Sequence, residues 1–191
     1  MEGWRLLLTG ARSAAENMGI DEAILREREQ GRAPNTLRLY TWTPSAISIG
    51  YFQSMEDEVD LGACDEHGVD TVRRITGGGA VFHDREGEVT YSLVVDEDEP
   101  LIPRKVLDSY GVLCAGIVEG LRILGMEAEF KPINDIVLGG KKISGNAQTR
   151  RFHGVLQHGT ILYDVDPRLM FTLLKVPNEK VRDKMISAVE E

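Results

Sequence analysis

Apolar residues recur at helical spacing in several stretches of the chain. The first runs from about Ser13 to Glu29, and Ser13 with Glu16 forms a capping box at its start. A second stretch, over about 104–124, carries its apolar residues on one face and is followed by Gly125. Glycine is common just after the end of a helix. Helices are therefore predicted over about 13–29, 59–67 and 104–124, with a further amphipathic stretch from near Pro167.

Shorter runs alternate apolar and polar residues or are rich in β-branched and aromatic residues, which predicts strands. TLRLYTW (36–42) and AISIGYFQ (46–53) are separated by a Thr-Pro-Ser turn, which favours a hairpin or an adjacent strand pair. Strands are further predicted over 71–76, over 88–95 and, with a tight turn at Gly139-Gly140, through the region from 135 to 166. This element order predicts an α+β fold with a mostly antiparallel or mixed sheet flanked by helices.

Composition narrows the class of protein. The 191 residues, of which 42% are hydrophobic, suit a single domain over residues 1–191. No apolar run approaches the roughly 20 residues of a membrane helix, and the net charge of −9 argues against a nucleic-acid-binding surface. Cys64 and Cys114 make no disulfide framework. We therefore expect a cytoplasmic protein with free thiols that binds neither nucleic acid nor membrane.

Positive charge is concentrated in one segment. Between Lys131 and His153 the chain carries five basic residues and one acidic residue, so this segment contributes +4 and the remainder −13. A solvated hairpin with lysines at its turn would explain this equally well. A local anion site is the alternative.

The segment RRITGGGAVFHD (73–84) carries the clearest candidate chemistry. Three glycines between two predicted strands can turn main-chain N–H groups toward an anion, although a plain flexible loop has the same composition. The loop is neither a Walker A motif nor a dinucleotide fingerprint, because no Gly-Lys-Ser/Thr follows and because a strand rather than a helix comes next. Arg73 and Arg74 add two cations, and Asp84 can orient the ring of His83.

A second group of residues flanks the predicted turn at Gly139-Gly140. Pairing of the two strands brings Asp135 close to Lys142, which offers a carboxylate for Mg²⁺ or ribose and an ammonium for phosphate. A surface ion pair is the structural alternative. His158-Gly159 is a third candidate site, for which a buried, hydrogen-bonded histidine is the alternative.

Three ordered motifs resemble a known family. RRITGGGAVFHD (73–84), INDIVLGGKKISGNAQTR (133–150) and LQHGTILYDVD (156–166) look like the catalytic domain of lipoate–protein ligases, in the biotin/lipoyl ligase superfamily. AENMGIDEAIL (15–25) resembles the first helix of that family, with Gly19 where alanine is usual. The likeness extends from about residue 4 to residue 184.

The resemblance implies an enzyme that activates lipoate with MgATP to lipoyl-adenylate and transfers the acyl group to a lysine. The acceptor would be a lipoyl domain of a 2-oxoacid dehydrogenase E2 component or the glycine cleavage H protein. Lys142 would be the catalytic residue. By the same resemblance Arg74, Thr76, Gly77, Gly78, Gly79, His158 and Gly159 would bind the acyl substrate, Val81, Phe82, His83, Asn134, Asp135, Ser144 and Gly145 would bind the nucleotide, and Asp135 would hold the metal.

Two other functions compete with the ligase. An octanoyltransferase of the same fold needs a nucleophilic cysteine near the lysine, yet AEFKPIND (128–135) and RRFHGVLQHG (150–159) contain none, and Cys114 falls on the apolar face of a predicted helix. A non-catalytic lipoyl-binding module is the other alternative, against which Lys142 and Asp135 weigh. Neither the acyl chain, lipoyl or octanoyl, nor the acceptor follows from the sequence.

Ligases of this family usually continue into further residues and a small accessory domain. We therefore expect either a fragment or a separate accessory subunit. On that expectation the chain alone binds lipoyl-adenylate but forms it poorly.

Overall fold

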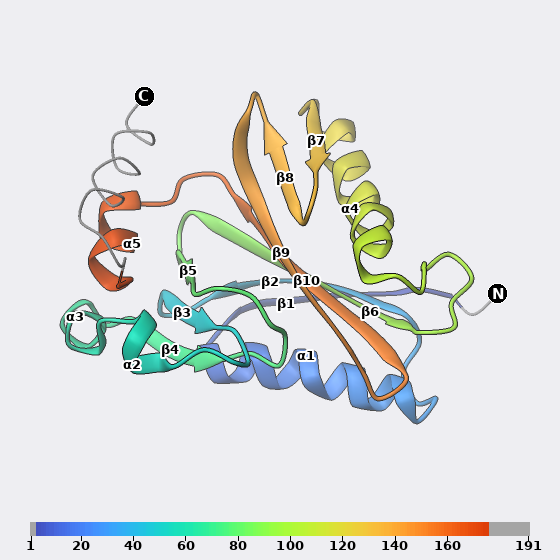
Figure 1. Cartoon of the computed structure of the whole chain (residues 1–191), viewed down its shortest axis with the longest axis horizontal. Helices are drawn as coiled ribbons and strands as arrows, with labels where there is room; N and C mark the ends of the chain where they lie inside the picture. Colours follow the sequence, from blue (N-terminus) through green and yellow to red (C-terminus); the bar gives the residue numbers. More distant parts are fainter. Residues whose placement is uncertain (1–2, 176–191) are drawn as a thin grey trace.

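The computed structural model describes residues 3–175, and its main feature is a seven-stranded mixed sheet (Figure 1). Strand order is β1-β2-β6-β10-β9-β8-β7, in which β1 and β2 are parallel and the other neighbours antiparallel. The strands are β1 (Arg5–Arg12), β2 (Thr36–Trp42), β6 (Glu88–Asp96), β7 (Ala128–Lys131), β8 (Asp135–Leu138), β9 (Lys141–Arg151) and β10 (Gly154–Leu162). The predicted α+β class with a mixed sheet is confirmed.

A second, three-stranded sheet has the order β4-β3-β5. Its strands are β3 (Ala46–Ile49), β4 (Asp70–Arg73) and β5 (Val81–His83), and the helices are α1 (Ala14–Glu29), α2 (Met55–Glu58), α3 (Leu61–His67), α4 (Val106–Ile123) and α5 (Pro167–Leu173). The predicted helix over 59–67 begins two residues later, because Asp60 caps it by accepting a hydrogen bond from the Ala63 N–H. No helix within residues 3–175 combines the length and apolar character needed to cross a membrane.

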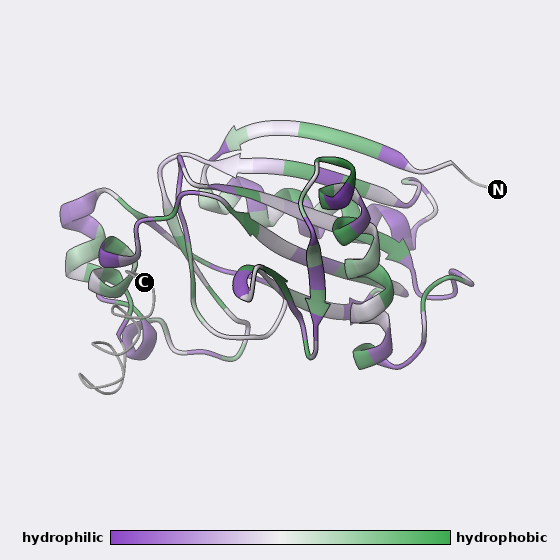
Figure 2. Cartoon of the chain, turned by 90° about the horizontal axis from the view of Figure 1, so that it is seen from above, coloured by the Kyte–Doolittle hydropathy of each residue, from purple (hydrophilic) through white to green (hydrophobic). Residues whose placement is uncertain are grey.

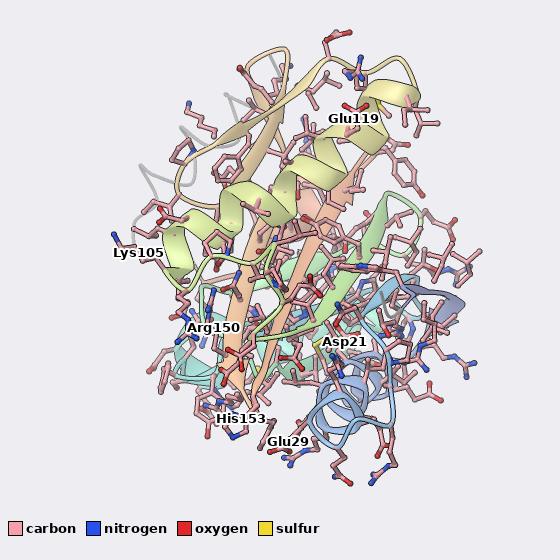
Figure 3. The ribbon with its side chains drawn as sticks, turned by 90° about the vertical axis from the view of Figure 1, so that its right-hand side faces the viewer. Asp21, Glu29, Lys105, Glu119, Arg150 and His153 are labelled. Carbon is pink, nitrogen blue, oxygen red and sulfur yellow. The ribbon has the colours of Figure 1, made fainter. Side chains whose placement is uncertain are left out.

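Helices α1 and α4 cover opposite faces of the large sheet, as the end-on view shows (Figure 3). Successive side chains of β6 point to opposite faces, so Leu93 and Val95 pack with Leu113 of α4, whereas Val94 packs with Leu25 of α1. Strand β1 forms one edge of the sheet, and its middle is hydrophobic (Figure 2).

A buried ion pair joins α1 to the sheet. Arg38 on β2 and Asp21 on α1 are almost completely buried, and Nη1 of Arg38 donates to Oδ1 of Asp21 over 2.6 Å. Asp21 also accepts hydrogen bonds from Tyr40 and Ser92, and Arg38 donates to Asn17. In Figure 3, Asp21 lies between α1 and the strands. Burial opposes ionisation of Asp21, but its interaction with His158, the charge of Arg38 and the hydrogen bond from Ser92 outweigh this effect and lower the pKa of Asp21.

One strand was missed and two predictions about local structure were wrong. Strand β1 was not predicted, and segments 36–42 and 46–53 do not pair with each other, because β2 lies in the large sheet and β3 in the small one. The glycine segment does not lead directly into 88–95, since β5 intervenes and pairs with β3. These pairings join distant parts of the chain, and alternation within one strand does not reveal its partner.

We predict that Arg38→Ala will be strongly destabilising. Removing one member of a buried ion pair leaves the other charge uncompensated, which costs about 3–5 kcal/mol. Arg122→Ala is the matched control, because Arg122 forms an exposed pair with Glu119 on α4 and its loss should leave the unfolding midpoint nearly unchanged. Urea unfolding measures both variants, and equal midpoints would contradict the importance of the buried pair.

We also predict that Gly19→Ala will stabilise α1. Gly19 is exposed in the middle of the helix and a Cβ there meets no atom within 4 Å, so alanine should raise the free energy of unfolding by about 0.5–1 kcal/mol. Gly31 has equal space but a φ of +67°, so Gly31→Ala should destabilise the protein. A thermal melt that moves both variants in the same direction would be inconsistent with this explanation.

Candidate functional site

A cavity of about 230 Å³ lies between the small sheet and the face of the large sheet that α1 covers. It is lined by residues of α1, both sheets, the glycine loop (74–80) and the β8–β9 hairpin, namely Met18, Tyr40, Trp42, Ser48, Arg74, Gly78, Gly79, Ala80, Val81, His83, Thr90, Asn134, Lys142, Gly145, Asn146, Ala147, His158, Gly159 and Thr160. Two permanent cations, Arg74 and Lys142, are in this set, and no aspartate or glutamate is among these described lining residues. In a chain of net charge −9, the cavity therefore presents local positive charge, which favours an anionic ligand.

Lys142 enters the cavity from the β8–β9 hairpin. The turn at Gly139-Gly140 is confirmed, and Nζ of Lys142 lies 2.8 Å from Oδ1 of Asp135. A register shift next to Ile136 places Lys142 opposite Val137 rather than Asp135, so the pair reaches diagonally across the strands. A Cβ at Gly145 would lie 3.1 Å from Lys142 Nζ. Gly145 thus leaves the space through which the lysine reaches the site.

Arg74 binds the glycine loop itself. Its guanidinium donates to the carbonyls of Gly77 and Gly79 over 2.8 and 2.7 Å, to the carbonyl and hydroxyl of Ser48 over 2.9 and 3.1 Å, and to Thr76 Oγ1 over 3.1 Å. These five bonds engage every part of the guanidinium. Burial lowers the pKa of Arg74 to about 10. In this conformation Arg74 positions the loop, in addition to contributing positive charge to the cavity.

Close approach of two main chains fixes the glycine loop. A Cβ at Gly50 would lie 2.0 Å from the Gly78 carbonyl oxygen, and a Cβ at Gly78 would lie 2.9 Å from Arg74 Nη2. Gly78 also has a φ of +97°, which favours glycine. Arg73 has a different role from Arg74, because it donates to the carbonyls of Gly50 and Tyr51 outside the cavity.

His158 connects the loop to the buried ion pair. Its Nδ1 lies 3.3 Å from Asp21 Oδ2 and its Nε2 lies 2.7 Å from Thr76 Oγ1. Burial lowers the pKa of His158 despite the nearby Asp21, so the ring is neutral at pH 7. With Nδ1–H donating to the carboxylate, Nε2 accepts from Thr76, which in turn accepts from Arg74. His158 is thus a buried, hydrogen-bonded histidine, and it is also part of the cavity wall.

His83 belongs to a second hydrogen-bonded group. Its Nδ1 lies 2.8 Å from Glu88 Oε1, its Nε2 lies 2.8 Å from Ser48 Oγ, and its ring stacks on Trp42 with centroids 4.0 Å apart. Asp84 was expected to orient this ring. Instead Asp84 accepts from the N–H groups of Glu86 and Gly87, and the fully buried Glu88 takes that role.

The predicted site residues fall into two groups. Arg74, Gly78, Gly79, Val81, His83, Asn134, Lys142, Gly145, His158 and Gly159 line the cavity, whereas Thr76, Gly77, Phe82, Asp135 and Ser144 do not. Thr76, Gly77 and Asp135 still contact lining residues through the bonds described above. Phe82 points the other way and packs with Ile47, because side chains alternate along β5, and Ser144 is fully buried beside Asn146.

Several residues of the site were not predicted. Ser48 and Trp42 line the cavity and Glu88 contacts the lining residue His83. All three fall within predicted strands, and their side chains gave no signal of a shared site. The available signal was the alternation in EVTYSLVV (88–95). Every second residue at its start is polar, namely Glu88, Thr90 and Ser92, and the structure buries all three. A buried carboxylate needs a partner, and in the structure that partner is His83.

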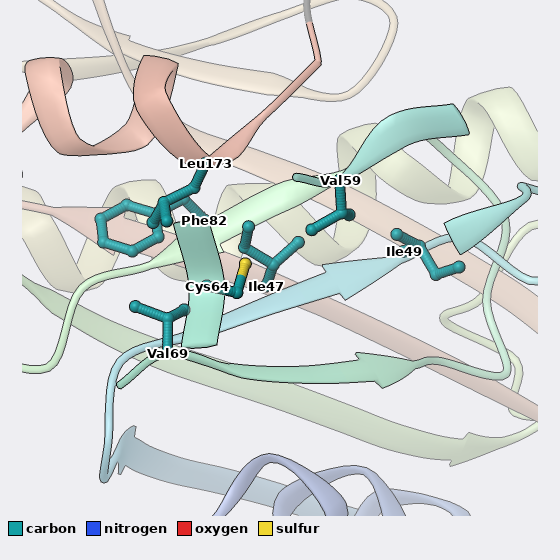
Figure 4. Close-up of a cluster of buried hydrophobic side chains, with 7 residues drawn as sticks. All are labelled: Ile47, Ile49, Val59, Cys64, Val69, Phe82 and Leu173. Carbon is teal, nitrogen blue, oxygen red and sulfur yellow. The ribbon is translucent and has the colours of Figure 1, made fainter. Parts of the chain in front are cut away.

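Neither cysteine lines the cavity. Cys64 packs with Ile47, Val69 and other apolar side chains on the far side of the small sheet (Figure 4). Cys114 on α4 is fully buried and accepts a weak hydrogen bond from Gln157. Burial raises the pKa of Cys114 to about 11, so this thiol is unreactive at pH 7.

Within residues 3–175, no three histidine, cysteine, aspartate or glutamate side chains lie close enough together to hold a metal ion by themselves. Asp135 offers one carboxylate, which Lys142 contacts. Mg²⁺ commonly uses one or two carboxylates together with substrate phosphates and water. Asp135 fits that arrangement and remains the predicted metal ligand.

Comparison with known proteins identifies the family. Residues 13–191 match the family model of the lipoyl protein ligase A/B catalytic domain. Octanoyltransferase LipM of Kyrpidia tusciae is 45% identical over 213 residues, covering 100% of this chain and 77% of that protein, and LipM of Bacillus subtilis is 37% identical, covering 96% and 74%.

Solved structures agree with this match. The bi-partite lipoate protein ligase of Thermoplasma acidophilum, described with its E2 lipoyl domain, has a TM-score of 0.85 at 35% identity, covering 100% of this chain and 72% of that one. Lipoate-protein ligase A bound with ATP has a TM-score of 0.78 at 34% identity, covering 96% and 74%. The family model and these relatives together show that the chain belongs to the lipoyl protein ligase A/B catalytic-domain family.

Proposed function

We propose that the protein transfers a lipoyl or octanoyl group to a lysine amine of a lipoyl-acceptor domain, and that it activates the acyl group as an acyl-adenylate. The observation that carries the proposal is the charge of the cavity, which has Arg74 and Lys142 in its wall and no acidic residue among its described lining. Activation of a carboxylate by ATP brings two anions together, and fixed positive charge reduces their repulsion. The solved ligase bound with ATP supports the same chemistry by similarity.

Each part of the site has a proposed task. The Lys142 ammonium contacts the α-phosphate and the acyl carbonyl, and Asp135 holds its side chain over Gly145. Asn134 and Val81 contact the nucleotide from the rim, while Gly78 and Gly79 cover the acyl group. MgATP supplies the activated phosphate, with Asp135 as one metal ligand. The glycine loop covers the acyl group and thereby excludes water from a mixed anhydride that otherwise hydrolyses.

The proposed acceptor protein is based on similarity to a relative. The ligase of Thermoplasma acidophilum is described with its E2 lipoyl domain, and we propose an E2 lipoyl domain or a glycine cleavage H protein as the acceptor here. A separate accessory subunit is a further proposed partner, which would act in the activation step rather than in transfer.

Octanoyl transfer from acyl carrier protein is a second candidate. The curated relatives named above are octanoyltransferases, which favours a thioester donor and no use of ATP. A thioester route normally needs a side-chain nucleophile that takes the acyl group first. Cys64 and Cys114 do not meet that need, because both are buried outside the cavity.

We predict that Lys142→Ala will lower acyl transfer to an acceptor domain by about 10²-fold or more, as losing one preorganised charge at an oxyanion commonly does. Lys141→Ala is the matched control, since Lys141 is exposed and does not line the cavity, and it should retain the wild-type rate. Mass spectrometry of the acceptor domain measures transfer from three donors: lipoate with MgATP, octanoyl-carrier protein, and preformed lipoyl-adenylate.

The three donors separate the candidates. Modification with lipoate and MgATP or with preformed adenylate supports the adenylate route. If only octanoyl-carrier protein modifies the acceptor, the adenylate route is wrong and the second candidate function takes its place. If Lys142→Ala and Lys141→Ala transfer the acyl group at equal rates, Lys142 is not the catalytic residue.

We further predict that the double variant Cys64→Ala/Cys114→Ala keeps its transfer rate with whichever donor the wild type uses. Both thiols lie in apolar packing, so their removal should affect stability rather than activity. The same acceptor assay and a thermal melt measure the two effects. A lost activity in a variant that remains folded would show that one thiol takes part in transfer.

A further inference from the structure

We propose that Ser48, His83 and Glu88 form a nucleophilic triad that accepts an acyl group from a thioester, giving a seryl ester without ATP. This activity goes beyond adenylate formation, and it supplies the second candidate function with the nucleophile that the cysteines do not provide. The substrate class is a medium-chain acyl thioester.

Strand pairing places the three residues together. Ser48 on β3 pairs with Val81, and His83 lies two residues along β5, so Ser48 and His83 share the face of the small sheet that lines the cavity. Glu88 begins β6 of the large sheet and reaches the ring of His83 from behind. The triad therefore spans the junction of the two sheets.

The hydrogen bonds have one consistent direction. Glu88 Oε1 accepts from His83 Nδ1 over 2.8 Å and from the Thr90 hydroxyl, which itself accepts from the Trp42 indole N–H. With the proton of His83 on Nδ1, its Nε2 accepts, and Ser48 Oγ–H donates to it over 2.8 Å. A carboxylate, an imidazole and a hydroxyl in this order are the arrangement in which histidine acts as the general base for serine.

Two further features suit a nucleophile. Arg74 Nη1 donates to Ser48 Oγ over 3.1 Å, which stabilises negative charge on that oxygen when its proton leaves. Glu88 is fully buried, and its Oε2 makes no hydrogen bond to any described residue. An incompletely satisfied carboxylate stabilises the positive ring that forms when His83 takes the serine proton.

The structural alternative is a purely supporting network. Ser48 and His83 are both buried from bulk solvent, yet both line the cavity, as do Gly78 and Gly79. A network that only supported the fold would have no need to place the serine oxygen and the basic ring nitrogen at a wall that an acyl group reaches.

The reaction balances without a further co-reactant. Ser48 Oγ forms a bond to the acyl carbon and the carbon–sulfur bond breaks, while the serine proton passes through His83 Nε2 to the departing thiolate. In the second step an acceptor amine attacks the ester carbon, the carbon–oxygen bond breaks, and Ser48 regains a proton. The sum is thioester plus amine giving amide plus thiol, and water in place of the amine gives the free acid.

The test uses the whole chain with octanoyl-pantetheine, without ATP or acceptor protein. Free thiol is followed by a colorimetric assay, and the acylated residue is located by peptide mass spectrometry. We expect thiol release together with one octanoyl group on the Ser48 peptide. Ser48→Ala should abolish both signals, and Glu88→Gln should slow thiol release by about 10²-fold or more while the protein stays folded.

Controls separate chemistry from folding. Ser109→Ala removes another buried serine, on α4 and away from the cavity, and should keep thiol release. Ser48→Cys should again be acylated, now as a thioester that neutral hydroxylamine cleaves. A folding defect cannot produce this hydroxylamine-sensitive product. The variant Cys64→Ala/Cys114→Ala should behave as wild type.

If the wild-type protein releases no thiol from octanoyl-pantetheine, the triad proposal is wrong. The adenylate route would then still be judged on its own assay, by acceptor modification with lipoate and MgATP or with preformed adenylate. Thiol release that persists in Ser48→Ala would equally overturn the proposal.

Discussion

The structure depends on the compensation of charges that are buried between α1 and the large sheet. Asp21 receives hydrogen bonds from Arg38 and Tyr40 of β2, Ser92 of β6 and His158 of β10, so one carboxylate links a helix to three strands. A buried ion pair adds little net stability compared with apolar packing, but an incomplete one is costly. The fold is therefore constrained to assemble these elements together, and the floor of the cavity is assembled with them.

The same constraint extends to the glycine loop. From Asp21 the hydrogen bonds continue through His158 and Thr76 to Arg74, whose remaining donors hold the carbonyls of the loop. Arg74 also touches Ser48, which belongs to the group around His83 and Glu88. One guanidinium thus joins both networks. Groups held in this way need little reorganisation when charge develops in the cavity, which is the condition under which electrostatic stabilisation is most effective.

Features with a local cause could be predicted from the sequence. The capping box of Ser13 and Glu16, the turn at Gly139-Gly140 and the nearness of Asp135 to Lys142 all follow from residues close together in the chain. The separation of β2 and β3 into two sheets, and the use of Glu88 rather than Asp84 beside His83, depend on pairings between distant segments. Asn17 and Asp21 were missed because polar residues on a buried helix face weaken the apolar pattern that predicts such a face. The motifs of the resemblance identified the family correctly, but they did not distinguish a ligase from an octanoyltransferase.

That ambiguity has a physical basis in the cavity. An acyl-adenylate and an acyl thioester both present an activated carbonyl, and a cationic wall that includes the glycine loop suits the negative oxygen that forms when either is attacked. The two routes differ in which atom attacks the acyl carbon or the phosphorus first. In this chain both sulfur atoms of cysteine are in apolar packing, while a serine oxygen with a histidine and a buried glutamate lies at the wall. Oxygen is a weaker nucleophile than sulfur and requires a general base, and the pairing of Ser48 with His83 meets that requirement. Under our proposals, the position of the nucleophile, rather than the shared motifs, therefore distinguishes the two routes.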